Sequence, residues 1–288
     1  MITRIACIFL LILLDLRLAN AQIVVTSRNE AGNRYLNYYT DLIKLALEKT
    51  RPEYGDYRME EIEPVETVSN LNLILQNTQP NLVVELTYDK QLSANGDATF
   101  IDIPIDGGSL GYRVCFINPR IKNELKKVSS FADLRKYTFV HGVGWADTEI
   151  LRHNGLKVIE VPDFESTHKM LIAGRVDLFC RGAHQLKDDA DYFKLYNKIA
   201  IDETFVLFYV LPRFFYLNSK NILAKKRIAA GMELAFKDGS LKQLWLKYNK
   251  KGIDLVNRKP RKVYYLENPL IKDLTPGYAR YFFDPLTK

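Results

Sequence analysis

The feature that most constrains the fold is an alternation of strand-like and helix-like runs. The first series reads strand, helix, strand, helix, strand, from QIVVTS at 22–27 to NLVVEL at 81–86. Its first helix-like run, at 37–50, carries apolar residues at helical spacing, and Pro52 and Gly55 follow it. This order predicts a parallel sheet covered by helices.

A second series of the same kind follows a glycine-rich bend, GGSLG at 107–111. The order is strand-like YTFVHG, a helix-like segment, strand-like LKVIEV, a second helix-like segment and strand-like VDLFCRG. Gly155 and Gly174 stand where the two helices should end. A long apolar run at 202–213 comes next. We therefore predict an α/β protein in which residues 111–200 form a second domain with its own sheet.

The amino terminus has the pattern of a secretory signal peptide. Arg4 precedes the apolar run IACIFLLILL, and small residues follow, with cleavage expected after Ala21. The apolar run is shorter than the roughly 20 residues needed to span a bilayer. Cys7 lies near the start of that run, which does not fit a lipid attachment site. We expect residues 1–21 to be removed and the mature protein to be soluble in the periplasm.

Processing at this position leaves two cysteines, Cys115 and Cys180, in strand-like runs. In an oxidising compartment they could form a disulfide, but sequence does not show how far apart they lie. Since free cysteine packs as a small apolar residue, we expect two buried thiols, with the disulfide as the alternative.

The chain is basic, with a formal charge of +7 and a pI near 9.1. Such a balance can indicate nucleic acid, a membrane surface or an anionic ligand. The densest clusters, KKR at 225–227 and RKPRK at 258–262, are short. We expect a solvated basic surface and no nucleic-acid binding. The four histidines lie on different elements, so no metal site is predicted.

The order of the elements resembles the type II periplasmic solute-binding proteins. More closely, it is similar to the polar amino acid receptors of ABC transporters, extracellular solute-binding protein family 3. The resemblance covers nearly all of 22–288. It is carried by YYTDLIKLALEKT, the stretch ending in LTYDK, IPIDGGSLGYRV, FADLRKYTFVHGVG, MLIAGRVDLFC and AGMELAFKDGSLKQLW.

This resemblance implies a two-lobed α/β fold with two crossover strands as its hinge. The first lobe would comprise 22–105 and 206–288, and the second lobe 111–200, with the hinge near 104–113 and 200–209. It further implies a clamp that closes on a small molecule and serves a membrane transporter or a sensor kinase ectodomain. We expect a monomer without a cofactor.

Four candidate ligand-binding residues follow from matching the family's motifs. Where relatives carry an arginine in a T-x-x-R setting, this chain has Thr87 and Lys90. Arg113 lies in an apolar strand-like run, so it needs either a ligand anion or a structural carboxylate as partner. Arg181 stands near the position where relatives hold the ligand ammonium with an aspartate. The three cations together predict an anionic ligand.

Five more candidates lie where strands of an open α/β sheet should end, since ligands bind there. Arg28 and Tyr35 follow the first strand-like run, His141 and Trp145 flank the glycines after YTFVHG, and Glu85 lies near the end of the third strand. For each, the alternative is an ordinary surface or packing role.

An enzyme on the same scaffold, similar to a periplasmic dehydratase, is the main alternative function. Glu85 and His141 could supply a general acid and base. The stretch GGSLG also fits G-x-S-x-G, but a β-like run follows Ser109 where a nucleophile elbow needs a helix. We therefore predict no catalytic residues. A second alternative is a sensory module that binds a membrane receptor.

Overall fold

The computed structural model describes residues 22–29, 36–65, 67–94, 96–192 and 198–283, and all structural statements concern these residues. The predicted signal peptide and Tyr35 lie outside them. The chain packs as two compact units, which we describe separately. The first unit comprises Met1–Leu86, Gln91–Ile103 and Phe214–Leu244, and the second comprises Thr87–Lys90, Pro104–Arg213 and Trp245–Lys288.

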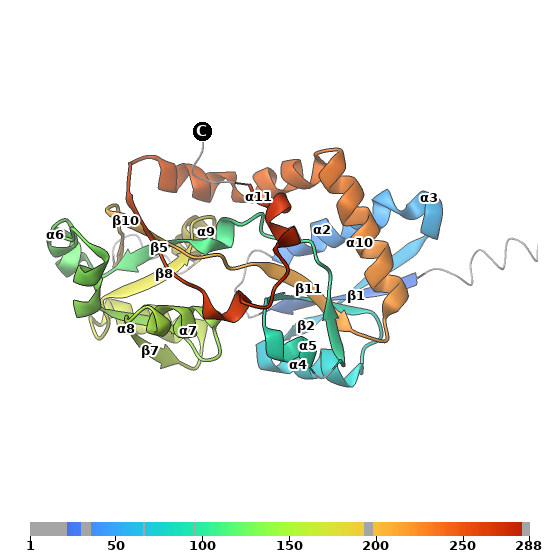
Figure 1. The fold of residues 1–288 in the computed structure, drawn as a ribbon, viewed down its shortest axis with the longest axis horizontal. Coiled ribbons are helices and arrows are strands. Elements are labelled where there is room, and N and C mark those ends of the chain that lie inside the picture. Colours follow the sequence, from blue (N-terminus) through green and yellow to red (C-terminus); the bar gives the residue numbers. More distant parts are fainter. Residues whose placement is uncertain (1–21, 30–35, 66, 95, 193–197, 284–288) are drawn as a thin grey trace, which may run out of the picture. The chain divides into compact units, whose positions relative to one another are not determined.

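The first unit is built on a five-stranded sheet of order β2-β1-β3-β11-β4 (Figure 1). Its strands are β1 (Gln22–Asn29), β2 (Tyr57–Val65), β3 (Leu82–Thr87), β4 (Ala98–Phe100) and β11 (Arg213–Asn218). The helices that follow or cover them are α2 (Leu36–Lys49), α3 (Arg51–Tyr54), α4 (Thr67–Gln76), α5 (Lys90–Ala94) and α10 (Ile222–Lys237). β1 pairs in parallel with both β2 and β3, as the βαβαβ opening predicts.

Helix α2 buries Tyr38, Leu42 and Ala46 of the face predicted by its helical spacing, whereas Leu45 of that face is half-buried. α10 packs against it at Gly231, where a Cβ atom would lie 2.0 Å from the carbonyl oxygen of Ala46. Only glycine allows the two helix backbones to approach so closely.

The second unit contains a larger sheet of order β12-β10-β5-β8-β6-β7, with β9 also paired to β5. Its strands are β5 (Tyr112–Ile117), β6 (Thr138–Gly142), β7 (Lys157–Val161), β8 (Leu178–Gly182), β9 (Ala200–Ile201), β10 (Phe205–Phe208) and β12 (Lys262–Tyr265). Its α-helices are α6 (Lys122–Leu125), α7 (Ala146–His153), α8 (Phe164–Ile172), α9 (Leu186–Tyr192) and most of α11 (Ser240–Asn257). Short 3-10 helices are η1 (Ser109–Gly111), η2 (Pro119–Ile121), η3 (Phe131–Lys136), η4 (Pro269–Ile271) and η5 (Pro276–Tyr281).

Alternate residues of β5 face two separate hydrophobic clusters. Ile117 and Cys115 belong to a cluster that includes Ile150 of α7, while Val114 and Phe116 belong to a second cluster on the other face. Because both faces are covered, the strand reads as a continuous apolar run.

Cys115 and Cys180 form a disulfide. The two residues are directly opposite each other on the antiparallel strands β5 and β8. The expectation of two free buried thiols was therefore wrong. The strands were recognised as strand-like, but their pairing depends on long-range topology that the sequence pattern does not reveal.

The carboxyl-terminal residues from Trp245 onward group with the second unit, whereas the resemblance placed 206–288 in the first lobe. Two contacts explain this grouping. Val256 of α11 belongs to a core cluster of the second unit, and β12 extends the sheet beside β10.

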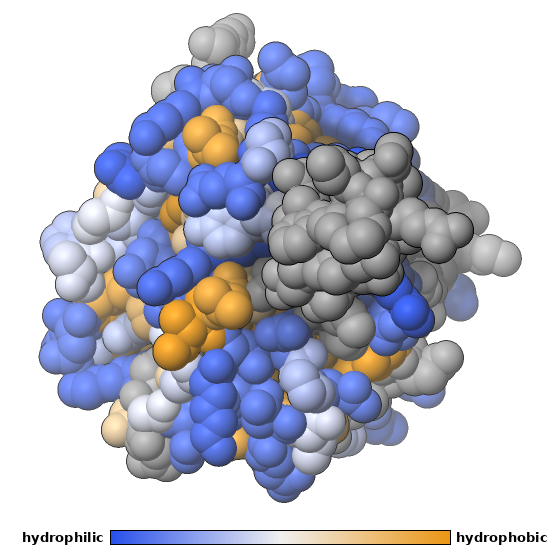
Figure 2. Space-filling view, turned by 90° about the vertical axis from the view of Figure 1, so that its right-hand side faces the viewer, coloured by the Kyte–Doolittle hydropathy of each residue, from blue (hydrophilic) through white to orange (hydrophobic). Residues whose placement is uncertain are grey.

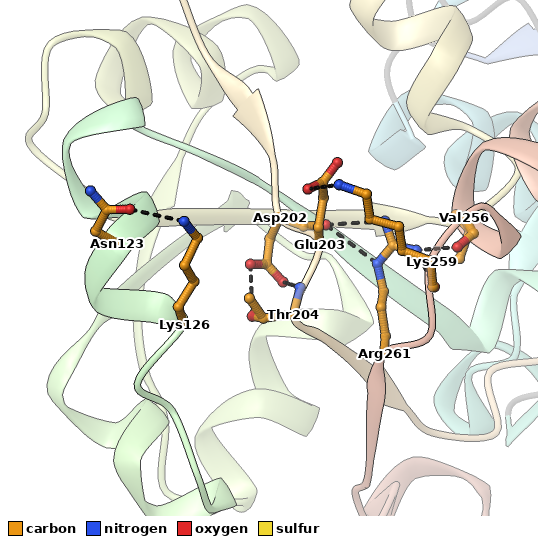
Figure 3. Close-up of polar contacts among 8 residues, drawn as sticks. All are labelled: Asn123, Lys126, Asp202, Glu203, Thr204, Val256, Lys259 and Arg261. Atoms are coloured by element: carbon orange, nitrogen blue, oxygen red, sulfur yellow. Dashed lines mark hydrogen bonds and ion pairs between the residues drawn. The ribbon is translucent and has the colours of Figure 1, made fainter.

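A polar junction fixes this carboxyl-terminal part beside β10 (Figure 3). The carboxylate of Asp202 accepts a hydrogen bond from the amide of Thr204, and the guanidinium of Arg261 donates to the Asp202 carbonyl oxygen. The amide of Phe205 also donates to the Asp202 carboxylate. Lys259 pairs with Glu203 at 2.7 Å. Part of the basic cluster at 258–262 is thus engaged in local contacts.

The other basic cluster is also not wholly solvated. Arg227 is fully buried and donates to the carbonyl oxygens of Gly55 and Asp56, so the prediction of a solvated basic surface was wrong for this residue. The face drawn in Figure 2 is largely hydrophilic, with apolar side chains in small groups. Among the described residues, no helix has the length and apolar content needed to cross a membrane.

Candidate functional site

The turn between β6 and α7 in the second unit carries the predicted site residue Trp145. β6 ends at Gly142, and the side chain of Val143 is 62% exposed. Gly144 has a φ of +76°, a conformation that favours glycine. A Cβ on Gly142 would lie 2.6 Å from the indole of Trp145, so this glycine provides the space in which the indole packs.

The backbone of this turn presents hydrogen-bond donors. In the described part of the chain, the amides of Gly144, Ala146 and Asp147 have no acceptor within hydrogen-bond distance, while the Thr148 amide donates to the carbonyl oxygen of Trp145. Together with the positive end of the helix dipole, such amides can bind an anionic group. We refer to residues 142–147 as the α7 turn.

Asp147 would oppose an anion at this turn, but its charge is compensated. Nη2 of Arg113 lies 2.8 Å from Oδ1 of Asp147, and both side chains are almost fully buried. The hydroxyl of Tyr209 donates to the same oxygen. Burial raises the pKa of Asp147, but the Arg113 charge, the Tyr209 hydrogen bond and other neighbouring groups together outweigh burial and keep that pKa below its ordinary value.

This ion pair decides between the two partners considered for Arg113. A structural carboxylate, Asp147, occupies that position, and the Arg113 guanidinium also lies 5.6 Å from the ring centre of Tyr209. Neither Asp147 nor Tyr209 was among the residues predicted from the sequence. An acid in the first turn of a helix that follows a buried strand was the available signal.

His141 is fully buried beneath the α7 turn. Its ring lies 5.9 Å from Trp145 and 5.7 Å from Phe179. Burial lowers the pKa of His141 to about 4, so the imidazole is neutral at pH 7. Neither ring nitrogen has a hydrogen-bond partner among the described residues.

Arg181 also has an internal partner. Its Nε lies 2.7 Å from the Asp189 carboxylate, and both side chains are largely buried. Its guanidinium is 4.7 Å from the ring centre of Phe164 and 5.3 Å from that of Trp145. The acid sought beside β8 is therefore present on the following helix, α9, where sequence analysis did not look for it.

The remaining described candidates have surroundings of their own. Lys90 pairs with Asp273 at 2.6 Å, and both side chains are largely exposed. Thr87 ends β3 and is half-buried, and Glu85 is a buried residue of β3. Arg28 lies on β1, where the structure describes only the strand. Within the second unit, the structure thus brings Arg113, His141, Trp145 and Arg181 together.

Ser109 lies in a setting that does not match a nucleophile elbow. Its hydroxyl donates to the carbonyl oxygen of Asp106 at 2.7 Å and lies 3.0 Å from Nδ1 of His184. The hydroxyl proton is therefore engaged by the backbone, and a β-strand follows. Ser109 stabilises the bend formed by Gly107 and Gly108.

No family model matches the chain, and a search of curated proteins returns no match. Solved structures do match. An ancestral arginine-binding protein bound to arginine has a TM-score of 0.58 and 16% identity, covering 80% of this chain and 99% of that one.

The GluR0 ligand-binding core from Nostoc punctiforme, in complex with L-glutamate, has a TM-score of 0.55 and 16% identity, covering 79% and 98% of the two chains. A histidine kinase sensor domain with similarity to periplasmic binding proteins has a TM-score of 0.59 and 12% identity, covering 80% and 97%. At these identities the likeness establishes the fold. The predicted two-lobed periplasmic-binding-protein fold is confirmed.

Proposed function

We propose that this protein reversibly binds a small solute and presents it to a membrane transporter or a sensor. The observation that carries the proposal is the match in fold over about four fifths of the chain to proteins solved with arginine or glutamate, and to a sensor domain. The signal-peptide pattern at 1–21 supports a periplasmic location.

We further propose that the solute carries a carboxylate or another anionic group, which binds the amides of the α7 turn. The three cations that first motivated this idea do not carry it, because each is paired with a carboxylate. The support is instead the set of amide donors at Gly144, Ala146 and Asp147. Arg113 compensates the charge of Asp147. The other acid of this first turn, Glu149, is exposed, so solvent and salt screen its charge.

A panel of acidic, neutral and basic amino acids and organic acids tests this proposal by thermal and urea unfolding. A true ligand at a hundred times its Kd adds about 2.7 kcal/mol to the free energy of unfolding. We expect stabilisation by one class of acids. If only cationic compounds, or none of the panel, stabilise the protein, the proposal fails.

One substitution tests the α7 turn itself. Ala146 is the first residue of α7 and follows extended Trp145, so Ala146→Pro should remove an amide donor without breaking the helix. We expect at least a tenfold loss of affinity for the stabilising acid. Ala146→Gly keeps the amide and is the control. Equal binding by both variants would contradict a role for the turn.

We propose binding without turnover. The proton of Ser109 is held by a backbone carbonyl, and burial keeps His141 neutral with a pKa far below 7. Incubation of the stabilising compound with the protein should therefore leave its mass unchanged. A product detected by mass spectrometry, and lost in Glu85→Gln, would instead support the dehydratase-like alternative.

A further inference from the structure

The carboxyl-terminal segment at 266–283 follows β12 and belongs entirely to the second unit. We call these residues the strap. The chain passes from one unit to the other at Leu86–Thr87, Lys90–Gln91, Ile103–Pro104, Arg213–Phe214 and Leu244–Trp245. Three groups of contacts join the strap to the chain beside these crossings.

The first contact is with the chain that leads to Arg213. The amide of Leu266 donates to the carbonyl oxygen of Phe208 at 2.8 Å. The side-chain amide of Asn268 donates to the carbonyl oxygen of Val210, also at 2.8 Å. These bonds continue the pairing of β12 with β10 beyond the end of both strands.

The second contact is with the bend that follows Pro104. The amide of Phe283 donates to the carbonyl oxygen of Gly107 at 2.7 Å. Gly107 and Gly108 have φ values of +55° and +81°, and a Cβ on them would lie 2.6 Å and 2.7 Å from the rings of Phe283 and Phe282. The two phenyl rings therefore rest directly on the glycine backbone.

Trp245 completes this second contact from α11. Its indole Nε1 donates to the carbonyl oxygen of Asp106 at 2.9 Å, and its ring centre is 5.4 Å from that of Phe283. The indole is 2% exposed. Bend, strap and α11 thus pack as one group beside the crossing at Ile103–Pro104.

The third contact is weaker, because it is an exposed ion pair between Lys90 and Asp273. The strap is also joined to α7, the helix of the proposed site. The side-chain amide of Asn154 donates to the carbonyl oxygen of Glu267, and the Glu267 amide donates back to Asn154.

We infer that the strap restrains the crossing segments. The bend at 104–111 cannot change conformation without releasing Phe282 and Phe283, and the chain at 209–213 cannot do so without releasing Leu266 and Asn268. These segments are where a two-unit binding protein must flex. The strap is therefore a conformational device that sets the stiffness of the crossings. Its test needs no ligand, so its failure would leave the proposed solute binding untouched.

A matched pair of glycine substitutions tests this inference in the full-length protein. Gly108 and Gly239 both have a φ of +81°, so alanine strains both backbones alike. Only at Gly108 does the new Cβ collide with Phe282, since nothing lies within 4 Å of it at Gly239. The difference between Gly108→Ala and Gly239→Ala therefore isolates displacement of the strap.

Hydrogen exchange of three crossing amides is the measurement. The amides of Ile105, Gly111 and Tyr209 donate to Arg213, Gly108 and Gly111 respectively. We expect them to exchange at least tenfold faster in Gly108→Ala than in Gly239→Ala. Phe282→Ala should accelerate exchange of the same amides. Since Gly108→Ala and Phe282→Ala disrupt the same contact between the bend and the strap, the double variant should exchange no faster than either single variant.

Amides of β6 and β8 report on the unit as a whole. If these strands accelerate as much as the crossing amides, the phenyl rings merely stabilise the unit and the inference is overturned. Crossing amides that exchange at the same rate in Gly108→Ala and Gly239→Ala would overturn it too.

Discussion

Removal of the Cys115–Cys180 disulfide should destabilise the protein strongly. The bond closes a loop with a sequence separation of 65 residues. In the loop-entropy description, cross-linking a loop of this length costs the unfolded chain about 4 kcal/mol of conformational freedom. Typical small domains are stable by only about 5–15 kcal/mol, so this is a large share of the total.

Urea unfolding of the native protein and of Cys115→Ala/Cys180→Ala measures this effect. Both cysteines are at most 1% exposed, so a reductant reaches the bond only when the protein opens. The native protein should therefore be unfolded and refolded in reductant as a second comparison. We expect both routes to lower the free energy of unfolding by about 4 kcal/mol.

The single variant Cys115→Ala separates the cross-link from side-chain packing. It loses the bond but keeps the second sulfur, so most of the cost should already be present in it. If the double variant or the reduced protein unfolds within about 1 kcal/mol of the oxidised protein, the loop argument is refuted.

Three further predictions rest on buried groups. Burial lowers the pKa of His141 to about 4 and that of His184 well below its ordinary value, whereas both histidines of the unfolded chain bind a proton near pH 6.5. The free energy of unfolding should therefore fall as the pH drops from 6.5 toward 4, by about 3 kcal/mol for His141. Urea midpoints that do not change with pH would contradict this. Arg113→Met should cost about 3–5 kcal/mol by leaving the Asp147 carboxylate unpaired, and adding Asp147→Leu should recover part of that loss in the same assay. Gly231→Ala should lower the free energy of unfolding by more than the roughly 1 kcal/mol typical of point mutations, because its Cβ would lie 2.0 Å from the α2 backbone. Thermal unfolding measures this effect. An unchanged midpoint would show that the two helices can separate to admit the methyl group.

The order of elements in both units could be predicted from the sequence, because hydrophobic periodicity and helix-ending glycines are local signals. The βαβαβ opening and the strands β6, β7 and β8 follow from such patterns. The grouping of α11 and β12 with the second unit could not, since it depends on Trp245 meeting Asp106 from far along the chain.

The same limit applies to the candidate site. The apolar run around Arg113 predicts that this residue needs a partner, but not that Asp147 supplies it, because sheet register and helix orientation bring the two together. Arg181 was taken as an uncompensated cation for the same reason, although Asp189 lies only eight positions away. Pairing of buried charges is a tertiary property that residue spacing alone does not show.

Native mass spectrometry of freshly purified protein tests solute binding most directly. We predict a bound small acid that Ala146→Gly retains and Ala146→Pro loses, with both variants as stable as the parent. The account is contradicted if the bound compound is a cation without an acidic group, or if Ala146→Pro retains the acid as fully as Ala146→Gly.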